Sequence, residues 1–413
     1  MSTPHPRRAG VALSLFGARL VYAYNWYDIG AVLPLLQVGF SAGPEQLGVV
    51  LGVFLAGVGI FQIPAGFAAL RWGGRVTSLA GLTLMGAAGL ASAFSPTLWV
   101  LASLRFLAGV GAAFFFGPGL SLVSRYFPPG QRGPVIGLYN GAFSVGGAAG
   151  LFVGALVGEL FGWPIALGIG GIFMLGATAI VARAVPREVP PPVGESFRQL
   201  WLRGKPVLRS RSIWALALAL TGFWGAVYVV TQYLVQFAFV VHPAWGTGAA
   251  AALAAGVVLI SFPAGPVGGW IGERASDRRV TIAIFGALTG AIVFLVPVAP
   301  LIVLVPALLA LGFCDGVVFA VQYLMPAYFA ETRGEELALG IGLINSAQVL
   351  VGSGLAVAFG YLITAQGWTV AWLFAGIVAL GTLPLLVAVE RQPRSPHPAH
   401  VAPVLPPSPG PPA

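Results

Sequence analysis

Long apolar stretches, separated by short polar segments, restrict this chain to one class of structure. A helix of about 20 apolar residues spans the hydrocarbon core of a bilayer. Of the 413 residues, 58% are hydrophobic and 8% are charged, which excludes an ordinary soluble domain. We therefore predict an all-α membrane protein with twelve transmembrane helices, over residues 11–38, 47–70, 76–94, 98–126, 133–160, 164–181, 212–241, 249–271, 280–298, 301–329, 337–363 and 370–389.

Positive charge lies on one side of this topology. Nineteen of the 21 Lys and Arg residues fall in the termini or in alternate loops, and the opposite loops carry none. Because positive loops mark the cytoplasmic side, we expect both termini to be cytoplasmic, in a cell membrane such as a cell inner membrane. The net charge of +9 is then explained by contact with anionic lipid rather than with nucleic acid.

The chain divides into five segments. The central segment carries Phe197, Leu200 and Trp201 at helical spacing, which predicts an amphipathic helix on the membrane face. The last segment is rich in Pro, which predicts disorder. The segments are a cytoplasmic lead (1–10), an N-terminal six-helix half (11–182), a cytoplasmic central loop (183–211), a C-terminal six-helix half (212–390) and the tail (391–413).

An internal repeat relates the two halves. The heptapeptide that begins at Gly137 matches the one that begins at Gly342 at four positions, including Asn140 and Asn345, with an offset of 205 residues. Two six-helix halves in the same orientation predict a pseudo-twofold axis along the membrane normal. A binding site is expected between such halves near the bilayer midplane.

Two decapeptides that join apolar spans carry Gly at the first position and Arg at the sixth and tenth. Their spacing resembles the loop motif of the major facilitator superfamily, although Leu70 stands where that motif usually has an acidic residue. The matching residues are Gly66, Arg71 and Arg75 in the first copy, and Gly269, Glu273, Arg274 and Arg278 in the second.

The resemblance implies a secondary active transporter that works by alternating access between two rigid halves. Span 1 is loosely similar to anion:cation symporters and to monocarboxylate or cyanate-type carriers. We therefore expect a monomeric, proton-coupled carrier of a small polar or anionic organic solute. One cysteine, Cys314, and four scattered histidines give no metal-ligand spacing, so no metal or cofactor is predicted.

Other functions stay open. A drug/proton efflux antiporter is the first alternative, because spans 1 and 7 are aromatic, but span 5 has Gly141-Ala142 in place of the Gly-Pro of the antiporter motif. A membrane sensor or an embedded enzyme is a remote alternative. An enzyme would need a convergent nucleophile or metal set, and none is visible.

Charged residues inside spans are costly and tend to face a cavity or a partner. Asp28, with Tyr24 and Asn25 nearby on span 1, is predicted to contact substrate or to carry a proton; a structural carboxylate is the alternative. Arg105 on span 4 begins a run of Arg and spaced Gly that resembles the superfamily's span-4 pattern, which implies a role in coupling; a helix tie is the alternative. Arg19 lies opposite Asp28 on the helical wheel, and we expect a structural role for it rather than anion binding.

Polar residues of the second half complete the candidates. Trp224, Tyr228 and Gln232 recur every four residues on span 7 and are predicted to line the cavity. Asp315 on span 10 is a candidate for titration or for helix packing. Asn140 and Asn345 bind substrate or hold helices together, and the Gly residues around them favour the second role.

Overall fold

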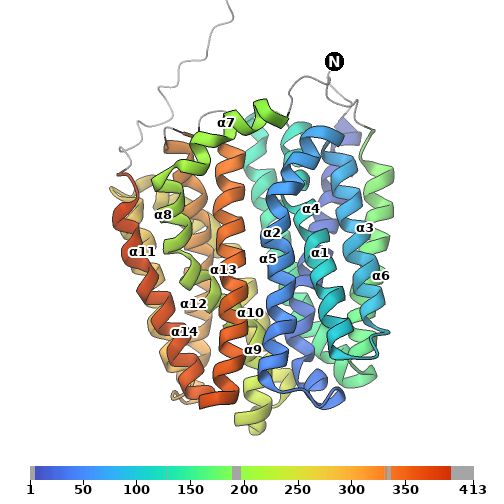
Figure 1. The fold of residues 1–413 in the computed structure, drawn as a ribbon, viewed down its shortest axis with the longest axis vertical. Helices are drawn as coiled ribbons and strands as arrows, with labels where there is room; N and C mark the ends of the chain where they lie inside the picture. Colours follow the sequence, from blue (N-terminus) through green and yellow to red (C-terminus); the bar gives the residue numbers. More distant parts are fainter. Residues whose placement is uncertain (1–4, 128, 188–196, 330, 333–335, 392–413) are drawn as a thin grey trace, which may run out of the picture.

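The fold is a bundle of long, nearly parallel helices (Figure 1). Every regular element in the part of the chain that the structure describes is helical. The predicted tail after residue 391 and residues 188–196 of the predicted central loop lie outside that part. The computed structural model describes residues 5–127, 129–187, 197–329, 331–332 and 336–391.

Six long helices form the first half of the bundle. They are α1 (His5–Gly39), α2 (Pro44–Trp72), α3 (Gly74–Ser92), α4 (Leu98–Tyr126), α5 (Pro129–Phe161) and α6 (Trp163–Ala184).

The second half follows a short helix, α7 (Phe197–Arg209), which lies across one end of the bundle (Figure 1). Its helices are α8 (Arg211–Ala219), α9 (Thr221–Val241), α10 (Thr247–Arg274), α11 (Arg278–Leu295), α12 (Leu301–Leu324), α13 (Glu336–Gln366) and α14 (Trp368–Thr382). Three single 3-10 turns are η1 (Pro243–Trp245), η2 (Met325–Tyr328) and η3 (Leu383–Ala388).

These helices confirm the predicted all-α fold, with a helix at each predicted span. Ten stretches of the described chain are long and apolar enough to cross a membrane, with α8 and α9 counted together. The other two predicted spans correspond to α1 and α3. The first carries Arg19, Asn25 and Asp28, and the second is rich in Gly, Ser and Thr, so their composition is more polar. Both pack against other helices of the bundle, which shelters their polar groups.

The predicted span 212–241 is two helices rather than one, and the break lies at Leu220. At the break the hydroxyl of Thr382 donates a hydrogen bond to the backbone carbonyl of Ala219, at 2.9 Å. A side chain at Gly222 would overlap the carbonyl of Val378 on α14. The end of α14 therefore both approaches the break closely and satisfies a carbonyl there.

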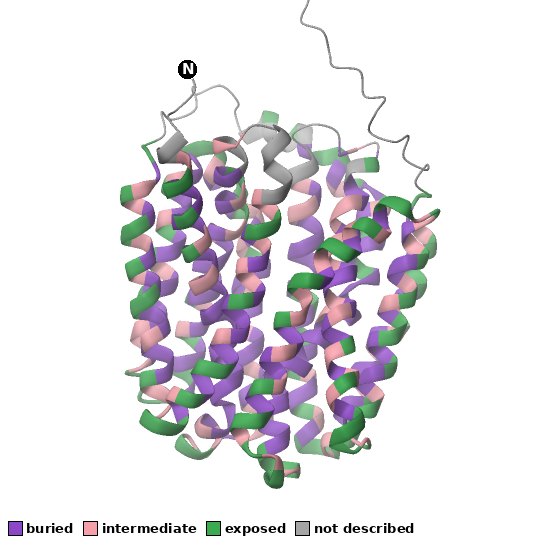
Figure 2. Cartoon of the chain, turned by 180° about the vertical axis from the view of Figure 1, so that it is seen from behind, coloured by how far each residue is buried: buried purple, intermediate pink, exposed green. Residues whose placement is uncertain are grey.

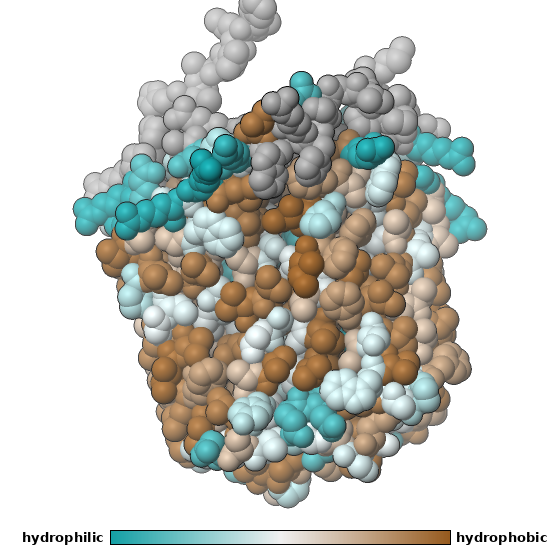
Figure 3. Space-filling view, viewed as in Figure 1, coloured by the Kyte–Doolittle hydropathy of each residue, from teal (hydrophilic) through white to brown (hydrophobic). Residues whose placement is uncertain are grey.

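The surface follows the expected polarity of a membrane protein. Seen from behind, exposed residues lie on the outward faces of the helices and buried ones between them (Figure 2). In the space-filling view hydrophobic residues cover most of the flank, and hydrophilic ones gather at the end where α7 lies (Figure 3). We call this end, which carries exposed Arg71, Arg183 and Arg274, the basic end.

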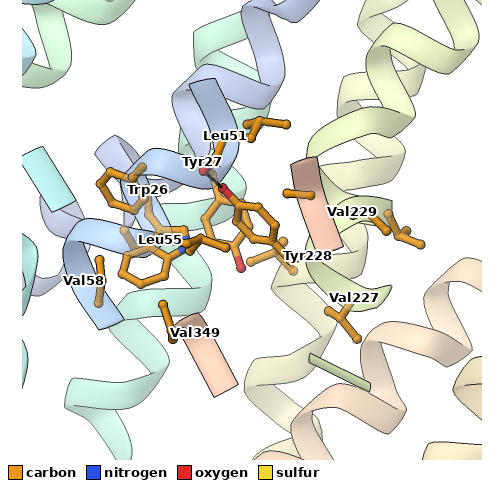
Figure 4. Close-up of a cluster of buried hydrophobic side chains, with 14 of the residues drawn as sticks. Trp26, Tyr27, Leu51, Leu55, Val58, Val227, Tyr228, Val229 and Val349 are labelled. Atoms are coloured by element: carbon orange, nitrogen blue, oxygen red, sulfur yellow. Dashed lines mark hydrogen bonds between the residues drawn. The ribbon is translucent and has the colours of Figure 1, made fainter. Parts of the chain in front are cut away.

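The two halves meet along three helix pairs, α1 with α9, α2 with α13 and α5 with α10. At the centre of this contact Trp26 of α1 packs against Phe54 of α2 and Tyr27 of α1 against Phe143 of α5, while Tyr228 of α9 reaches across to α2 (Figure 4). The Tyr228 hydroxyl donates a hydrogen bond to the carbonyl of Leu51, at 3.4 Å. Val349 of α13 belongs to the same buried cluster.

Two Glu–Thr contacts join the halves at the end opposite the basic end. The hydroxyl of Thr364 on α13 donates to the carboxylate of Glu45 on α2, and that of Thr247 on α10 donates to Glu159 on α5. A small buried cluster of four side chains lies between α1, α5, α9 and α10: Ala31, Ala155, Val235 and Ala251. At this end the two halves are closed against each other.

Candidate functional site

A cavity of about 710 Å³ lies between the two halves. Its wall comes from α1 and α5 of the first half and from α9, α10 and α12 of the second. The α5, α10 and α12 residues of the wall belong to the part of each helix nearer the basic end, and exposed Leu138 lies at its edge. The cavity therefore occupies the position predicted for a binding site and reaches the surface toward the basic end.

Arg19 contributes the one positive side chain among the described residues of this wall. Its side chain is 2% exposed, and its Nε and Nη1 atoms are buried without a hydrogen-bond partner in the described chain. The described ion pairs join other residues, so no carboxylate there neutralises this guanidinium. Burying a lone charge is costly, which points to a missing anionic partner.

Aromatic rings surround the Arg19 guanidinium. Cation–π contacts of this kind stabilise a cation that has lost its water, by about 0.5 to 2 kcal/mol each. They leave the N–H groups available for an acceptor. The ring centroids lie 4.7 Å from the guanidinium carbon for Tyr22, 5.0 Å for Phe116, 5.3 Å for Tyr139 and 4.6 Å for Phe143.

Sequence reasoning favoured a structural role for Arg19, and the structure places its side chain on the cavity wall. The helical wheel held the signal that could have found it. Arg19 lies opposite Asp28 on α1, so its side chain points away from the Asp28–Arg105 pair.

Asp315 contributes the negative side chain of the wall, from α12. Its Oδ2 accepts a hydrogen bond from the hydroxyl of Ser261 on α10, at 3.0 Å. Ser261 Oγ also lies 2.9 Å from the carbonyl of Gly312. Asp315 forms no salt bridge within the described chain, so the cavity that Arg19 lines also holds an acid without a cationic partner.

Asp28 and Arg105 form a buried ion pair inside the first half, away from the cavity wall. Arg105 Nη1 lies 3.2 Å from Asp28 Oδ1, and Arg105 Nη2 donates to the carbonyl of Asn25 at 2.9 Å. Both side chains are 1% exposed. The guanidinium also lies 4.8 Å from the ring centroid of Phe54 on α2. This pair thus ties α1, α2 and α4 together.

Tyr24 and Asn25 also point into the first half. The Asn25 amide donates to the carbonyls of Val21 and Gly170, both at 2.9 Å, and so fastens α1 to α6. Tyr24 is 4% exposed and lies against α6 near Gly170. Neither residue belongs to the cavity wall.

The residues predicted to line the cavity from α9 lie in two different surroundings. Trp224 and Tyr228 line the cavity, and the Trp224 Nε1 donor is buried without a partner in the described chain. Gln232 lies further along, where its amide donates to the carbonyl of Trp26 at 3.3 Å. These residues therefore begin at the cavity and continue into the α1–α9 contact.

The two repeat-related asparagines lie in different surroundings. Asn140 lines the cavity. Asn345 is buried at the α2–α13 contact, where its amide donates to Gln62 at 2.8 Å and its oxygen accepts from Tyr323 at 3.1 Å. Since Tyr323 lines the cavity, Asn345 connects the cavity wall to the contact between the halves.

No group of three or more His, Cys, Asp or Glu side chains that could hold a metal ion occurs among the described residues. The chemistry of the cavity therefore rests on its own charged, aromatic and amide side chains.

The model of the Major Facilitator Superfamily matches residues 15–353. The chain belongs to the major facilitator superfamily. It is accordingly a transporter rather than an enzyme, and a multi-pass membrane protein.

Its relatives within the superfamily carry varied solutes. The nitrite extrusion protein of Bacillus subtilis is 24% identical over 79% of this chain and 82% of that protein. The 4-hydroxybenzoate transporter PcaK of Pseudomonas aeruginosa is 29% identical over 50% of this chain and 45% of its own. Human monocarboxylate transporter 11 is 30% identical over 67% of this chain and 58% of that protein. The last two matches thus span less than two thirds of those relatives.

Solved structures of superfamily transporters share the fold. A peptide transporter POT in complex with sulfate gives a TM-score of 0.72 at 16% identity, over 92% of this chain and 94% of that one. A bacterial homologue of the human lysosomal transporter Spinster gives a TM-score of 0.69 at 18% identity, over 94% of this chain and 96% of that one.

The superfamily loop motifs occupy equivalent places in the two halves. Arg75 of the first copy donates to the carbonyls of Val185 and Ala182 at the C-terminal end of α6, at 2.8 and 2.7 Å. In the second half Arg279 makes the matching contact, to the carbonyl of Val389 at 2.9 Å. The structural counterpart of Arg75 is thus one residue beyond Arg278.

The remaining motif residues lie at the basic end. Arg71, Glu273 and Arg274 are exposed, and the Arg274 guanidinium lies 4.5 Å from the ring centroid of Trp270. The Arg278 side chain is buried against Tyr328, 4.3 Å from its ring centroid. Neither Gly66 nor Gly269 lies at a close helix contact, because a Cβ atom added at either residue would meet no atom within 4 Å.

An acid also stabilises the second loop. Asp277 accepts the backbone N–H of Arg279 at 3.0 Å and so caps α11. The Arg279 side chain bonds the same carboxylate, and these hydrogen bonds hold the pKa of Asp277 below its usual range.

Proposed function

We propose that this chain is a secondary active transporter of a small organic anion, which binds to Arg19 in the cavity between the halves. The observation that carries the proposal is the buried guanidinium of Arg19, which has two unpartnered donor nitrogens and faces the cavity. A carboxylate would form a charge-assisted hydrogen bond there and neutralise the charge. The carriers of 4-hydroxybenzoate, niacin and hexuronate among its relatives support an organic anion as the solute.

The transporter works by alternating access, with protons as the coupling ion and a single chain as the working unit. We assign the coupling to Asp315, which faces the same cavity without a cationic partner. Asp28 is already paired with Arg105, so protonating Asp28 would leave the buried guanidinium of Arg105 without a counter-charge, which is costly. Because positive charge marks the cytoplasmic side, the basic end is placed in the cytoplasm, and the cavity then faces inward.

Transport by purified protein in liposomes tests the proposal. With benzoate as the probe, the wild-type protein is expected to accumulate labelled solute when a pH gradient is imposed, and Arg19→Gln is expected to abolish uptake. Arg183→Gln, an exposed arginine outside the cavity, is the matched control and should leave uptake unchanged. Uptake by Arg19→Gln at the wild-type rate would overturn the proposal.

Coupling is tested separately. Asp315→Asn removes the titrating group but leaves Arg19, so it is expected to keep benzoate exchange between the two sides and to lose accumulation driven by the pH gradient. Glu390→Gln, an exposed acid outside the cavity, should keep both. Undiminished accumulation by Asp315→Asn would show that the proton binds elsewhere.

The aromatic wall of the cavity favours one second candidate, a drug/proton efflux antiporter. A lipophilic cation would stack on aromatic side chains and pair with Asp315. Such transport would depend on Asp315 and persist in Arg19→Gln, which is the reverse of the pattern expected for an anion.

A further inference from the structure

The cavity wall carries a balanced pair of charges. Of its described residues, Arg19 is the one cation and Asp315 the one acid. A solute with one carboxylate can therefore be neutralised by Arg19. A second carboxylate would find no cation and would be repelled by Asp315 whenever that acid is ionised. The charges of the wall thus select for a single negative charge.

The rest of the wall is mainly apolar and aromatic. Tyr27 comes from α1 and Phe143 from α5; the second half adds aromatic rings from α9, α10 and α12. Flat rings offer a large apolar surface and offset or edge contacts to a ring on the solute. The residues that the second half adds are Trp224, Tyr228, Phe262, Phe319 and Tyr323.

For a solute with several hydroxyls the wall offers the side chains of Tyr27, Asn140 and Ser144, because three other hydroxyls are already hydrogen-bonded within the chain. The hydroxyl of Tyr228 is bonded to Leu51, that of Tyr323 to Asn345, and that of Ser261 to Asp315. A buried hydroxyl left without a partner costs about 1 to 3 kcal/mol. A sugar acid would bury several, so it would bind weakly.

Trp224 offers one further donor. Its Nε1 is buried on the wall with no acceptor in the described chain. An acceptor at some distance from the carboxylate of the solute, such as a ring nitrogen or a phenolic oxygen, would satisfy it.

We infer that the solute is an amphipathic aromatic monocarboxylate, bound with its carboxylate at Arg19 and its ring among the aromatic side chains of the wall. A polar substituent on the ring accepts the Trp224 N–H. The inference rests on the proposed function and narrows it. A cavity of about 710 Å³ has room for a one-ring acid, whose ring would lie against the aromatic wall, whereas nitrite has no apolar surface to place there.

Exchange in liposomes tests the inference, with each anion serving as its own substrate. Liposomes loaded with one anion are placed in the same labelled anion, for benzoate, 4-hydroxybenzoate, terephthalate, glucuronate and nitrite in turn. We expect benzoate and 4-hydroxybenzoate to exchange at concentrations at least tenfold below those needed by the other three. Terephthalate is the sharpest comparison, because it keeps the ring of benzoate and adds only the second carboxylate.

Variants separate the parts of the site. Trp224→Phe keeps an aromatic ring and removes the N–H, so it is expected to weaken 4-hydroxybenzoate about tenfold more than it weakens benzoate, the equivalent of about 1.4 kcal/mol. Exchange of terephthalate or glucuronate as readily as benzoate, lost in Arg19→Gln, would overturn this inference and keep the proposed function. Exchange of nitrite as readily as benzoate would overturn the inference and the organic nature of the proposed solute. Absence of exchange for every anion would overturn both.

Discussion

Arg19 and Arg105 are the two arginines inside the predicted spans, and their surroundings give them different tasks. Arg105 is neutralised by Asp28 within the first half, whereas Arg19 faces the cavity without a carboxylate in the described chain. The sequence predicted that such charges are sheltered. It could not predict which charge has a partner, because that depends on how α1 is rotated against α4 and α5.

The ion pair allows a prediction about stability. Arg105→Gln leaves Asp28 as a buried charge without a partner, so the free energy of unfolding should fall by about 3 to 5 kcal/mol. Thermal unfolding of the purified protein in detergent measures the change, with Arg183→Gln as the control. The double variant Asp28→Asn with Arg105→Gln should recover part of the loss.

The transport role predicted for Asp28 can be judged in the same series. If Asp28→Asn unfolded at the wild-type temperature yet lost pH-driven accumulation, Asp28 rather than Asp315 would be the coupling acid.

At the scale of helices, glycines set how closely elements pack. A Cβ at Gly109 on α4 would overlap the carbonyl of Phe54 on α2, and one at Gly57 would overlap the carbonyl of Phe106. Small residues let helices approach closely in a membrane. The sequence located these helices to within a few residues. It missed the break at Leu220, because the hydroxyl that satisfies the carbonyl there comes from Thr382, far away in the chain.

Two substitutions on the same helix test this packing. Gly109→Val should separate α2 from α4 and destabilise the fold by about 1 to 3 kcal/mol or more. Gly117→Val on the same helix meets no atom within 4 Å and is the matched control. The folded, monodisperse fraction in size-exclusion chromatography measures the difference. Equal losses from both variants would contradict a specific α2–α4 contact.

At the scale of the whole molecule, the two Glu–Thr contacts are related by the internal repeat. Glu45 begins α2 and Thr247 begins α10, while Glu159 and Thr364 lie near the ends of α5 and α13. Each contact pairs an acid of the first half with a hydroxyl of the second. The repeat predicted the halves and a site between them. It did not predict these contacts, because they depend on how the two halves meet at this end.

Removing both hydroxyls should loosen this closed end. Each lost bond to a carboxylate is worth about 1.5 to 3 kcal/mol, so Thr247→Ala with Thr364→Ala should raise the population open at this end at least tenfold. Maleimide labelling of Ala251→Cys, a site buried between the halves, reports the opening. Thr178→Ala, whose hydroxyl bonds within α6, is the control. Unchanged labelling would mean that apolar packing alone closes this end.

The central claim is that Arg19 binds the anion, and calorimetric titration of purified protein with benzoate tests it most directly. The wild-type protein and Arg183→Gln should bind benzoate saturably with the same affinity. Arg19→Gln should bind at least thirtyfold more weakly, because a buried charge pair across an interface is worth about 2 to 5 kcal/mol. Benzoate binding to Arg19→Gln with wild-type affinity would contradict the account.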